Sequence, residues 1–304
     1  MKKILIPTDF SKIASKAYST AAQIARANGA SIVLFHASQS HFKNLATMAY
    51  PFTDANLIET AQDEDREEKK NALAKLDELS KANVFEGLTV ETRILTPDEI
   101  EVADAIVKAI NVDDHSLIVI GTEGEEKESE TVAQLVARHA TIPVITVKED
   151  IEALKIENIT LCTDFKNISR KFTHGLKAFA DKIGATITIL YINTPKNFLE
   201  TQDIITEFKR FKRMYDLKGT ELSVYNAYKV ESGILNYLNR TNSDLLALST
   251  HGRTGLSHFF FGSYTDDIIN QANVPVYTYN LHDFNEGKIH YEGSYSAYSG
   301  GFVG

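Results

Sequence analysis

Two kinds of hydrophobic pattern alternate along the chain. Short runs of apolar residues, typical of buried strands, precede longer stretches in which apolar positions recur every three or four residues, as in amphipathic helices. In the first half this pattern predicts strands at 3–8, 31–36, 88–95, 117–120 and 143–147. Helices are predicted from Ser11 to a stop at Gly29, within 39–80, at 97–110 and at 131–139.

The second half repeats the alternation. It predicts strands at 158–162, 186–192, 221–228, 245–248 and 275–279, with helices at 172–183, 204–215, 233–239 and 263–271. Strands that alternate with helices form parallel sheets through crossover connections. We therefore expect an α/β protein made of two tandem, open, five-stranded, Rossmann-like sheets. In such sheets, ligands bind beyond the carboxyl ends of the strands.

An internal repeat supports this division. The segment 7–10, Pro-Thr-Asp-Phe, matches 162–165, Cys-Thr-Asp-Phe, at an offset of 155 residues, and 29–36 matches 184–191 at the same offset. Later matches have offsets of 128 and 132. The chain is thus expected to hold one domain at 1–150 and a second at 151–281. Periodicity stops after residue 281, so we expect 282–304, rich in Gly, Tyr and Ser, to be disordered.

The change of offset from 155 to 128 assigns 27 extra residues to the first half, around 39–80. Within them, the acidic and basic run 63–70 places acids about one helical turn before bases, which favours a solvated helix face. An acidic surface that docks a protein partner is the alternative.

Composition narrows the class of partner. The chain has 304 residues, with 32 Lys plus Arg against 41 Asp plus Glu, and a net charge of −9. No basic stripe stands out, so we expect neither nucleic acid nor a membrane as partner. The single cysteine, Cys162, cannot form an intramolecular disulfide, and no apolar run approaches a signal-peptide core or a membrane span. We expect a cytoplasmic protein.

A candidate phosphate-binding loop follows the strand 245–248. Its glycines, Gly252, Gly255 and Gly262, allow the backbone to approach a ligand closely, and Ser263 leads into a predicted helix. The N–H groups and the dipole at a helix start attract phosphate, and Arg253 adds a positive charge.

These features resemble the universal stress protein family, over about residues 1–280. The family has Asp at the end of its first strand and the motif G-x2-G-x9-G-S/T after its fourth, which reads here Ser249-x2-Gly252-x9-Gly262-Ser263. The resemblance implies a universal stress protein-type fold and one site for ATP, with ADP or AMP as alternatives and Mg²⁺ as a further candidate. The site residues that it implies are Thr163, Asp164, Ile192, Ser249, Gly252, Arg253, Gly262 and Ser263.

Two departures from the motif matter. Ser249 replaces the first glycine, and if that position has positive φ, the added Cβ costs about 1 kcal/mol. In the first half, the loop after Gly121 is four residues shorter, and Glu130 stands where Gly262 stands among five glutamates. Because like charges repel in a confined site, we predict that the first half binds no nucleotide. Asp9 then has a structural role at the start of the next helix.

Other candidates are weaker. His251 and His258 lack partners at metal-binding spacing, and the acids at 266–267 either favour the helix dipole or hold Mg²⁺ beside phosphates. No catalytic motif for an ATPase, dehydrogenase or hydrolase is present, so at most slow ATP hydrolysis is expected.

The resulting hypothesis is a nucleotide-responsive stress regulator, with no catalytic residues and an unknown protein partner. The resemblance implies that the strands 143–147 and 275–279 pair within the chain as a pseudo-dimer, and that chains associate further as a homodimer. The alternatives are a protein-interaction module without nucleotide, or a slow ATPase or phosphotransferase in which Asp164 or the acids at 266–267 position water or Mg²⁺.

Overall fold

The computed structural model describes residues 2–38, 55–95, 101–112, 115–123, 131–149, 155–165, 168, 170–249 and 268–279. The first half contains β1 (Lys3–Pro7), α1 (Lys12–Asn28), β2 (Ser31–Ala37), α3 (Ala55–Ser80), the short 3-10 helix η1 (Asn83–Phe85), β3 (Val90–Leu95), α4 (Val102–Val112), β4 (His115–Gly121), α5 (Val132–His139) and β5 (Val144–Val147).

The second half repeats this order of strands and helices. It contains β6 (Asn158–Cys162), α6 (Arg170–Ile183), β7 (Thr186–Asn193), the 3-10 helix η2 (Pro195–Asn197), α7 (Thr201–Met214), β8 (Glu221–Asn226), α8 (Val230–Leu238), β9 (Leu245–Ser249) and β10 (Val276–Tyr279), with residues 268–271 helical before β10. The predicted α/β alternation is confirmed.

The helix boundaries follow local chemistry. Ser11 caps α1 as predicted, since its Oγ accepts the N–H of Ala14 at 3.1 Å, and Gly29 ends the helix with a left-handed φ of 61°. Our predicted start of α4 at Pro97 is wrong, because Glu101 is not helical and the helix begins at Val102. Pro97 itself lies outside the described residues.

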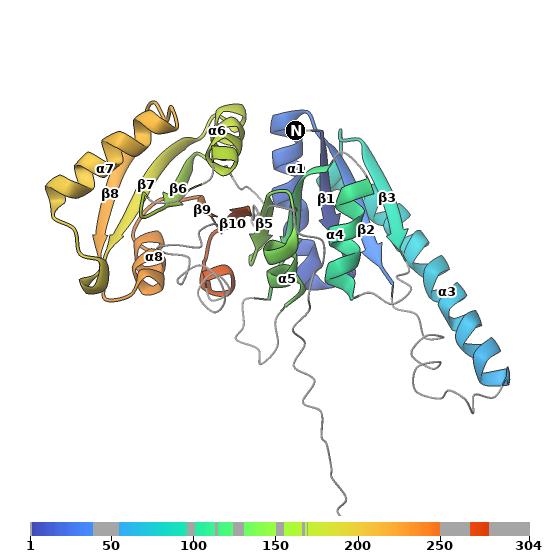
Figure 1. The fold of residues 1–304 in the computed structure, drawn as a ribbon. Coiled ribbons are helices and arrows are strands. Elements are labelled where there is room, and N and C mark those ends of the chain that lie inside the picture. Colours follow the sequence, from blue (N-terminus) through green and yellow to red (C-terminus); the bar gives the residue numbers. More distant parts are fainter. Residues whose placement is uncertain are drawn as a thin grey trace, which may run out of the picture.

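All ten strands form one sheet, in the order β3-β2-β1-β4-β5-β10-β9-β6-β7-β8 (Figure 1). Each half contributes five parallel strands. The edge strand β5 of the first half pairs antiparallel with the edge strand β10 of the second, with Tyr277 opposite Ile145, so these two strands lie in the middle of the joint sheet. The predicted pairing of the last strands within one chain is therefore confirmed. The two predicted sheets are one continuous sheet.

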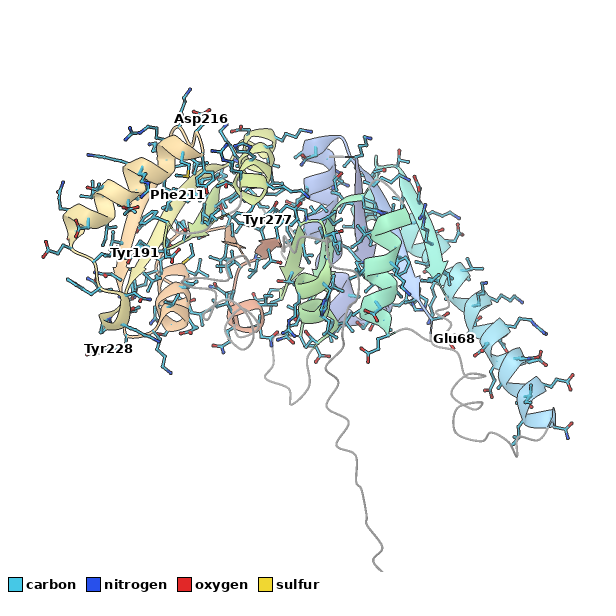
Figure 2. All side chains as sticks on the ribbon, in the orientation of Figure 1. Glu68, Tyr191, Phe211, Asp216, Tyr228 and Tyr277 are labelled. Atoms are coloured by element: carbon cyan, nitrogen blue, oxygen red, sulfur yellow. The ribbon has the colours of Figure 1, made fainter. Side chains whose placement is uncertain are left out.

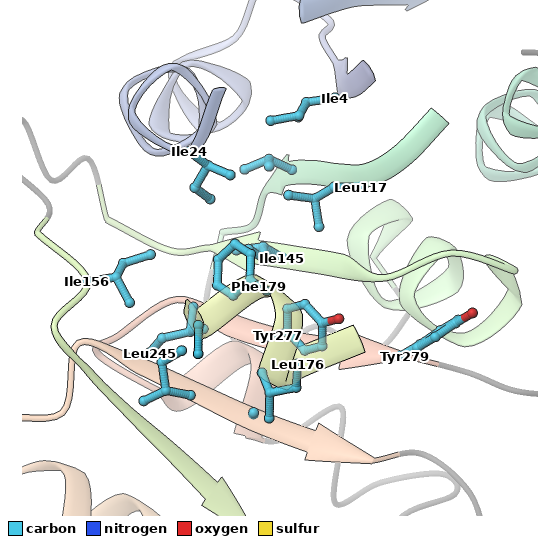
Figure 3. Packing of buried hydrophobic residues seen from close by; sticks show 14 of the residues in the cluster. Ile4, Ile24, Leu117, Ile145, Ile156, Leu176, Phe179, Leu245, Tyr277 and Tyr279 are labelled. Carbon is cyan, nitrogen blue, oxygen red and sulfur yellow. The ribbon is translucent and has the colours of Figure 1, made fainter. Parts of the chain in front are cut away.

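Two hydrophobic clusters cover the faces of this sheet and cross the β5–β10 seam. One cluster joins α1, α3, α6 and α7, and the other joins α4, α5, α8 and residues 268–272. At the seam, Ile24 and Ile145 of the first half pack in the same cluster as Phe179, Leu245 and Tyr277 of the second (Figure 3). The two halves share one core.

Candidate functional site

Each half has a point where the strand order reverses. In the first half β1 lies between β2 and β4, and in the second β6 lies between β7 and β9. Consecutive crossovers leave on opposite sides of that central strand, which opens a crevice beyond its carboxyl end. The two Thr-Asp-Phe segments follow β1 and β6 and therefore lie at these two crevices.

The Thr-Asp-Phe turns have the same geometry in both halves. Phe10 and Phe165 each have φ of 65°, in the left-handed region that non-glycine residues rarely adopt. The threonine before each turn holds it in place, since Thr8 Oγ1 accepts the Phe10 N–H at 3.0 Å and Thr163 Oγ1 accepts the Phe165 N–H at 2.9 Å. The same strained turn thus recurs at the two equivalent crevices.

In the first half, the aspartate of this turn serves the next helix. Asp9 Oδ1 accepts the backbone N–H of Ser11 at 2.9 Å, directly before α1. The structural role that we predicted for Asp9 is confirmed.

In the second half, four of the eight predicted site residues are described. Thr163 and Asp164 follow β6, Ile192 lies near the end of β7, and Ser249 ends β9. Cys162, which precedes Thr163, pairs with Leu248, which precedes Ser249. Cys162 also pairs with Leu190, two positions before Ile192. The sheet thus brings these four to one level of its carboxyl edge. Gly252, Arg253, Gly262 and Ser263 lie outside the described residues, as do His251, His258 and the acids at 266–267.

The side chains around this edge divide between the two faces. Tyr191 stacks on Phe165 with 5.4 Å between ring centroids, and its hydroxyl donates to the carbonyl oxygen of Asn197 at 3.1 Å (Figure 2). The Ile192 side chain lies on the other face, against Gly233 of α8. Since Tyr191 is only 4% exposed, its ring belongs to the core.

The nearby thiol is buried, as predicted. Cys162 ends β6, and burial, with a smaller contribution from the negative charge of Asp164, raises its pKa above the ordinary value. Asp164 contributes in the same way to the raised pKa of Tyr191, after burial. A thiol in this environment stays protonated and unreactive.

The helix that follows the first strand of each half begins at a different position in the two halves. In the first half, a Cβ on Gly121 would lie 1.9 Å from the carbonyl oxygen of Ile13, in the first turn of α1. The repeat places Ile168 at the position of Ile13, but α6 begins only at Arg170, after it. The Ile168 carbonyl instead accepts the hydroxyl of Tyr215 at 2.5 Å.

The strain that we considered for Ser249 is therefore wrong in its premise. Neither Gly121 nor Ser249 is among the residues of positive φ. Glycine is required at residue 121 because a backbone carbonyl approaches it, and that reason depends on the position of the neighbouring helix.

The first half holds a cavity of about 580 Å³ at its crevice, which we call the first-half cavity. Sequence reasoning missed its wall on α3, because residues 63–70 were interpreted as a solvated helix face or a protein-docking surface. The described residues that line it are Pro7, Thr8, Asp9, Ser11, Ile13, Ala14, Phe35, Ala37, Glu68, Val102, Ile106, Ile120, Gly121, Thr122, Glu123, Thr131, Val132 and Ala133.

The described residues show neither a metal-binding cluster nor a membrane-spanning helix. Within the part of the chain that the structure describes, no three His, Cys, Asp or Glu side chains gather closely enough to hold a metal ion. None of the described helices combines the length and the apolar character needed to cross a membrane.

Comparisons with known proteins agree with this fold. A universal stress protein from Archaeoglobus fulgidus DSM 4304 has a TM-score of 0.65 and 18% identity, and the match covers 92% of this chain and 98% of that one. A putative universal stress protein from Pseudomonas aeruginosa UCBPP-PA14 has a TM-score of 0.59 and 15% identity, over 92% of this chain and 93% of that one. Curated proteins provide no match.

The family assignment comes from the sequence itself. The profile of the universal stress protein family matches residues 1–148 and again residues 155–280, which are the two halves that the repeat defines. The chain therefore belongs to the universal stress protein family, as a tandem member with two family domains.

Proposed function

We propose that this protein is a nucleotide-responsive regulator that binds one ATP per chain, at the carboxyl edge of β6, β7 and β9. The observation that supports this most is the common level of Thr163, Asp164 and Ser249 beside the start of the glycine-bearing loop. A carboxylate at this edge can accept hydrogen bonds from ribose hydroxyls. Backbone N–H groups of a glycine-bearing loop can bind phosphate.

The position of α6 also fits this proposal. The carbonyl that approaches Gly121 comes from Ile13 inside α1, whereas the equivalent Ile168 precedes α6 and its carbonyl accepts the Tyr215 hydroxyl. The departure from the family motif at Ser249 therefore does not by itself exclude a nucleotide. ATP is the proposed ligand, with ADP or AMP as alternatives and Mg²⁺ as its companion ion. A cytoplasmic location, a homodimer of tandem chains and a regulatory protein partner complete the proposal.

The test is native mass spectrometry of the full chain purified without added nucleotide, followed by titration with ATP. We expect one ATP per chain in the wild type and none in Gly262→Glu, which copies Glu130 of the first half. The matched control is Gln202→Glu, which adds the same charge at an exposed position of α7 and should bind like the wild type. Two ATP per chain would contradict the single site, and none at millimolar ATP would favour a protein-interaction module.

A further inference from the structure

The equivalent helices α3 and α7 carry exposed stripes of opposite charge. Each helix lies between the second and third strands of its half, so the repeat relates them. On α3, exposed positions recur every three or four residues and include no base, and this acidic stripe consists of Thr60, Glu64, Glu67, Asn71, Ala74 and Glu78. On α7, an exposed stripe with the same spacing includes no acid, and this basic stripe consists of Gln202, Thr206, Lys209 and Arg213.

The basic stripe is available for contact. Arg210, beside the stripe, pairs with Glu207 at 3.6 Å, whereas Lys209 and Arg213 form no ion pair or side-chain hydrogen bond with any described residue. A surface hollow of about 550 Å³ lies along the stripe, and its described lining is Thr206, Lys209, Arg210, Arg213 and Met214. The surface of α7 therefore presents two unpaired cations together with an exposed apolar side chain, that of Met214.

The acidic stripe offers the complementary groups. Glu64 and Glu67 belong to the charged run 63–70, and neither has an ion pair within the part of the chain that the structure describes. Leu57, one helical turn before the stripe, is an exposed apolar side chain, as Met214 is beside the basic stripe. Opposite charges together with an apolar side chain on each helix make the two surfaces complementary.

The two stripes cannot meet within one chain. Leu76 of α3 and Phe211 of α7 belong to the same hydrophobic cluster, so both helices lie on one face of the sheet. Their neighbouring strands, β3 and β8, are the opposite edges of the ten-stranded sheet (Figure 1). At about 4.8 Å per strand, these edges are about 40 Å apart. The acidic stripe therefore cannot cover the basic stripe of its own chain.

A second copy of the chain carries both complements. We propose that two chains associate with the acidic stripe of each on the basic stripe of the other. A two-fold rotation that brings α3 of one copy onto α7 of its partner also brings α7 onto α3, so the dimer is closed and its two contacts are identical. This inference rests on the homodimer of the proposed function, and it does not involve the nucleotide.

The paired contacts explain how weak interactions can hold such a dimer. Single exposed ion pairs contribute little, but once one contact forms, the second becomes intramolecular and its effective concentration rises. Each chain has a net charge of −9, so two copies repel at long range. The basic stripe supplies the local attraction that opposes this repulsion.

The experiment is sedimentation equilibrium of the full chain without nucleotide, at about 0.05 M NaCl and again at about 0.5 M. The wild type should form a dimer with a micromolar dissociation constant, which the higher salt weakens at least tenfold. Lys209→Glu, Arg213→Glu reverses the basic stripe and should weaken the dimer at least tenfold at low salt. Glu64→Lys, Glu67→Lys reverses the acidic stripe and should have the same effect. Circular dichroism checks that each variant is folded.

An equimolar mixture of the two double variants tests the reciprocal contact. In a mixed dimer, one chain has two acidic stripes and the other has two basic stripes, so both contacts again join opposite charges. The mixed dimer should form within about threefold of the wild-type affinity. Each double variant changes the net charge of −9 by four, so both chains remain negative and their net charges do not attract.

The matched control is Lys229→Glu, Arg240→Glu. It changes the net charge as the basic-stripe variant does, at exposed positions on either side of α8, which belongs to the other hydrophobic cluster. Its dimer should stay within about twofold of the wild-type affinity.

Four outcomes would overturn the proposal. They are a monomeric wild type at low salt, a control as weak as the basic-stripe variant, a mixture of the double variants that stays monomeric, and a wild-type dimer that neither double variant weakens. The last outcome would keep the proposed homodimer and exclude only this contact. The nucleotide site is tested separately with ATP, so failure of either proposal leaves the other experiment interpretable.

Discussion

The hydroxyl of Tyr215, just after α7, donates a hydrogen bond of 2.5 Å to the carbonyl oxygen of Ile168, just before α6. The equivalent carbonyl in the first half, that of Ile13, lies within α1 and approaches Gly121. The same carbonyl position thus has different surroundings in the two halves, and in the first half its closeness requires glycine at residue 121.

Removing this hydrogen bond should destabilise the second half. Tyr215→Phe leaves a buried carbonyl oxygen without its donor, so we expect the free energy of unfolding to fall by about 1 to 2 kcal/mol. Urea denaturation followed by circular dichroism measures it. Tyr228→Phe is the control, because that side chain is 91% exposed, and it should be neutral (Figure 2). Equal stability of both variants would contradict the role given to Tyr215.

Exchanging the residues that end β4 and β9 should have unequal effects. Gly121→Ala places a Cβ against backbone atoms of Ile13 and Ala14, which cannot rotate away, so a loss of about 3 kcal/mol is expected. Ser249→Gly, the reverse change at the equivalent position, should cost less than about 1 kcal/mol. Urea denaturation of both variants tests this, and a well-tolerated alanine at residue 121 would show that α1 can move.

The two equivalent aspartates should differ in their effect on nucleotide. Asp164→Asn should weaken ATP binding about tenfold, because a neutral amide oxygen accepts hydrogen bonds from the ribose hydroxyls more weakly than a carboxylate does. Asp9→Asn is the matched variant, and it should bind ATP like the wild type, since the amide oxygen can still accept the Ser11 N–H. Equilibrium dialysis with labelled ATP measures both, and equal weakening would show that the first half also takes part.

Comparison of the wild type with Asp164→Asn also tests whether the protein hydrolyses ATP. If the protein is a regulator, ADP formation over several hours should not exceed a protein-free blank in the wild type or in Asp164→Asn. Formation of ADP by the wild type that Asp164→Asn abolishes would instead establish a slow ATPase.

Alkaline pH should destabilise the fold partly through Cys162. An unfolded thiol ionises near pH 9.0, whereas burial and the Asp164 carboxylate raise the pKa of the folded thiol. Above that pH the unfolded chain loses a proton that the folded chain keeps, so this thiol's contribution is complete below pH 9.0 and is lost as the pH rises. Between about pH 8.5 and 10, stability should fall more steeply for the wild type than for Cys162→Ala. The free energy of unfolding is measured by urea denaturation at each pH. An equal fall with pH in the wild type and in Cys162→Ala would contradict this prediction.

Most of the fold could be predicted because buried parallel strands give continuous apolar runs. The segment 117–120 is an example, and it recurs in the second half as the apolar run 245–248. The start of α4 at Val102 was missed, because Pro97 gave the stronger local signal for a helix start.

The candidate sites were less predictable. The sequence placed Thr163, Asp164, Ile192 and Ser249 at one sheet edge, because carboxyl ends of neighbouring parallel strands meet there. It did not reveal that Tyr215 bonds Ile168, 47 residues away, or that Glu68 reaches the first-half cavity. Such contacts depend on how helices pack across the sheet, which local patterns do not encode.

The β5–β10 seam also affects how the two crevices can evolve. In a dimer of identical chains, every substitution appears in both copies, so the two sites must keep the same charge and shape. Here one chain supplies both sides of the seam, with Tyr277 opposite Ile145, and a substitution at one crevice leaves the other unchanged. Covalent linkage thereby releases the pair from enforced symmetry, and one half can lose an inherited ligand while the other keeps it.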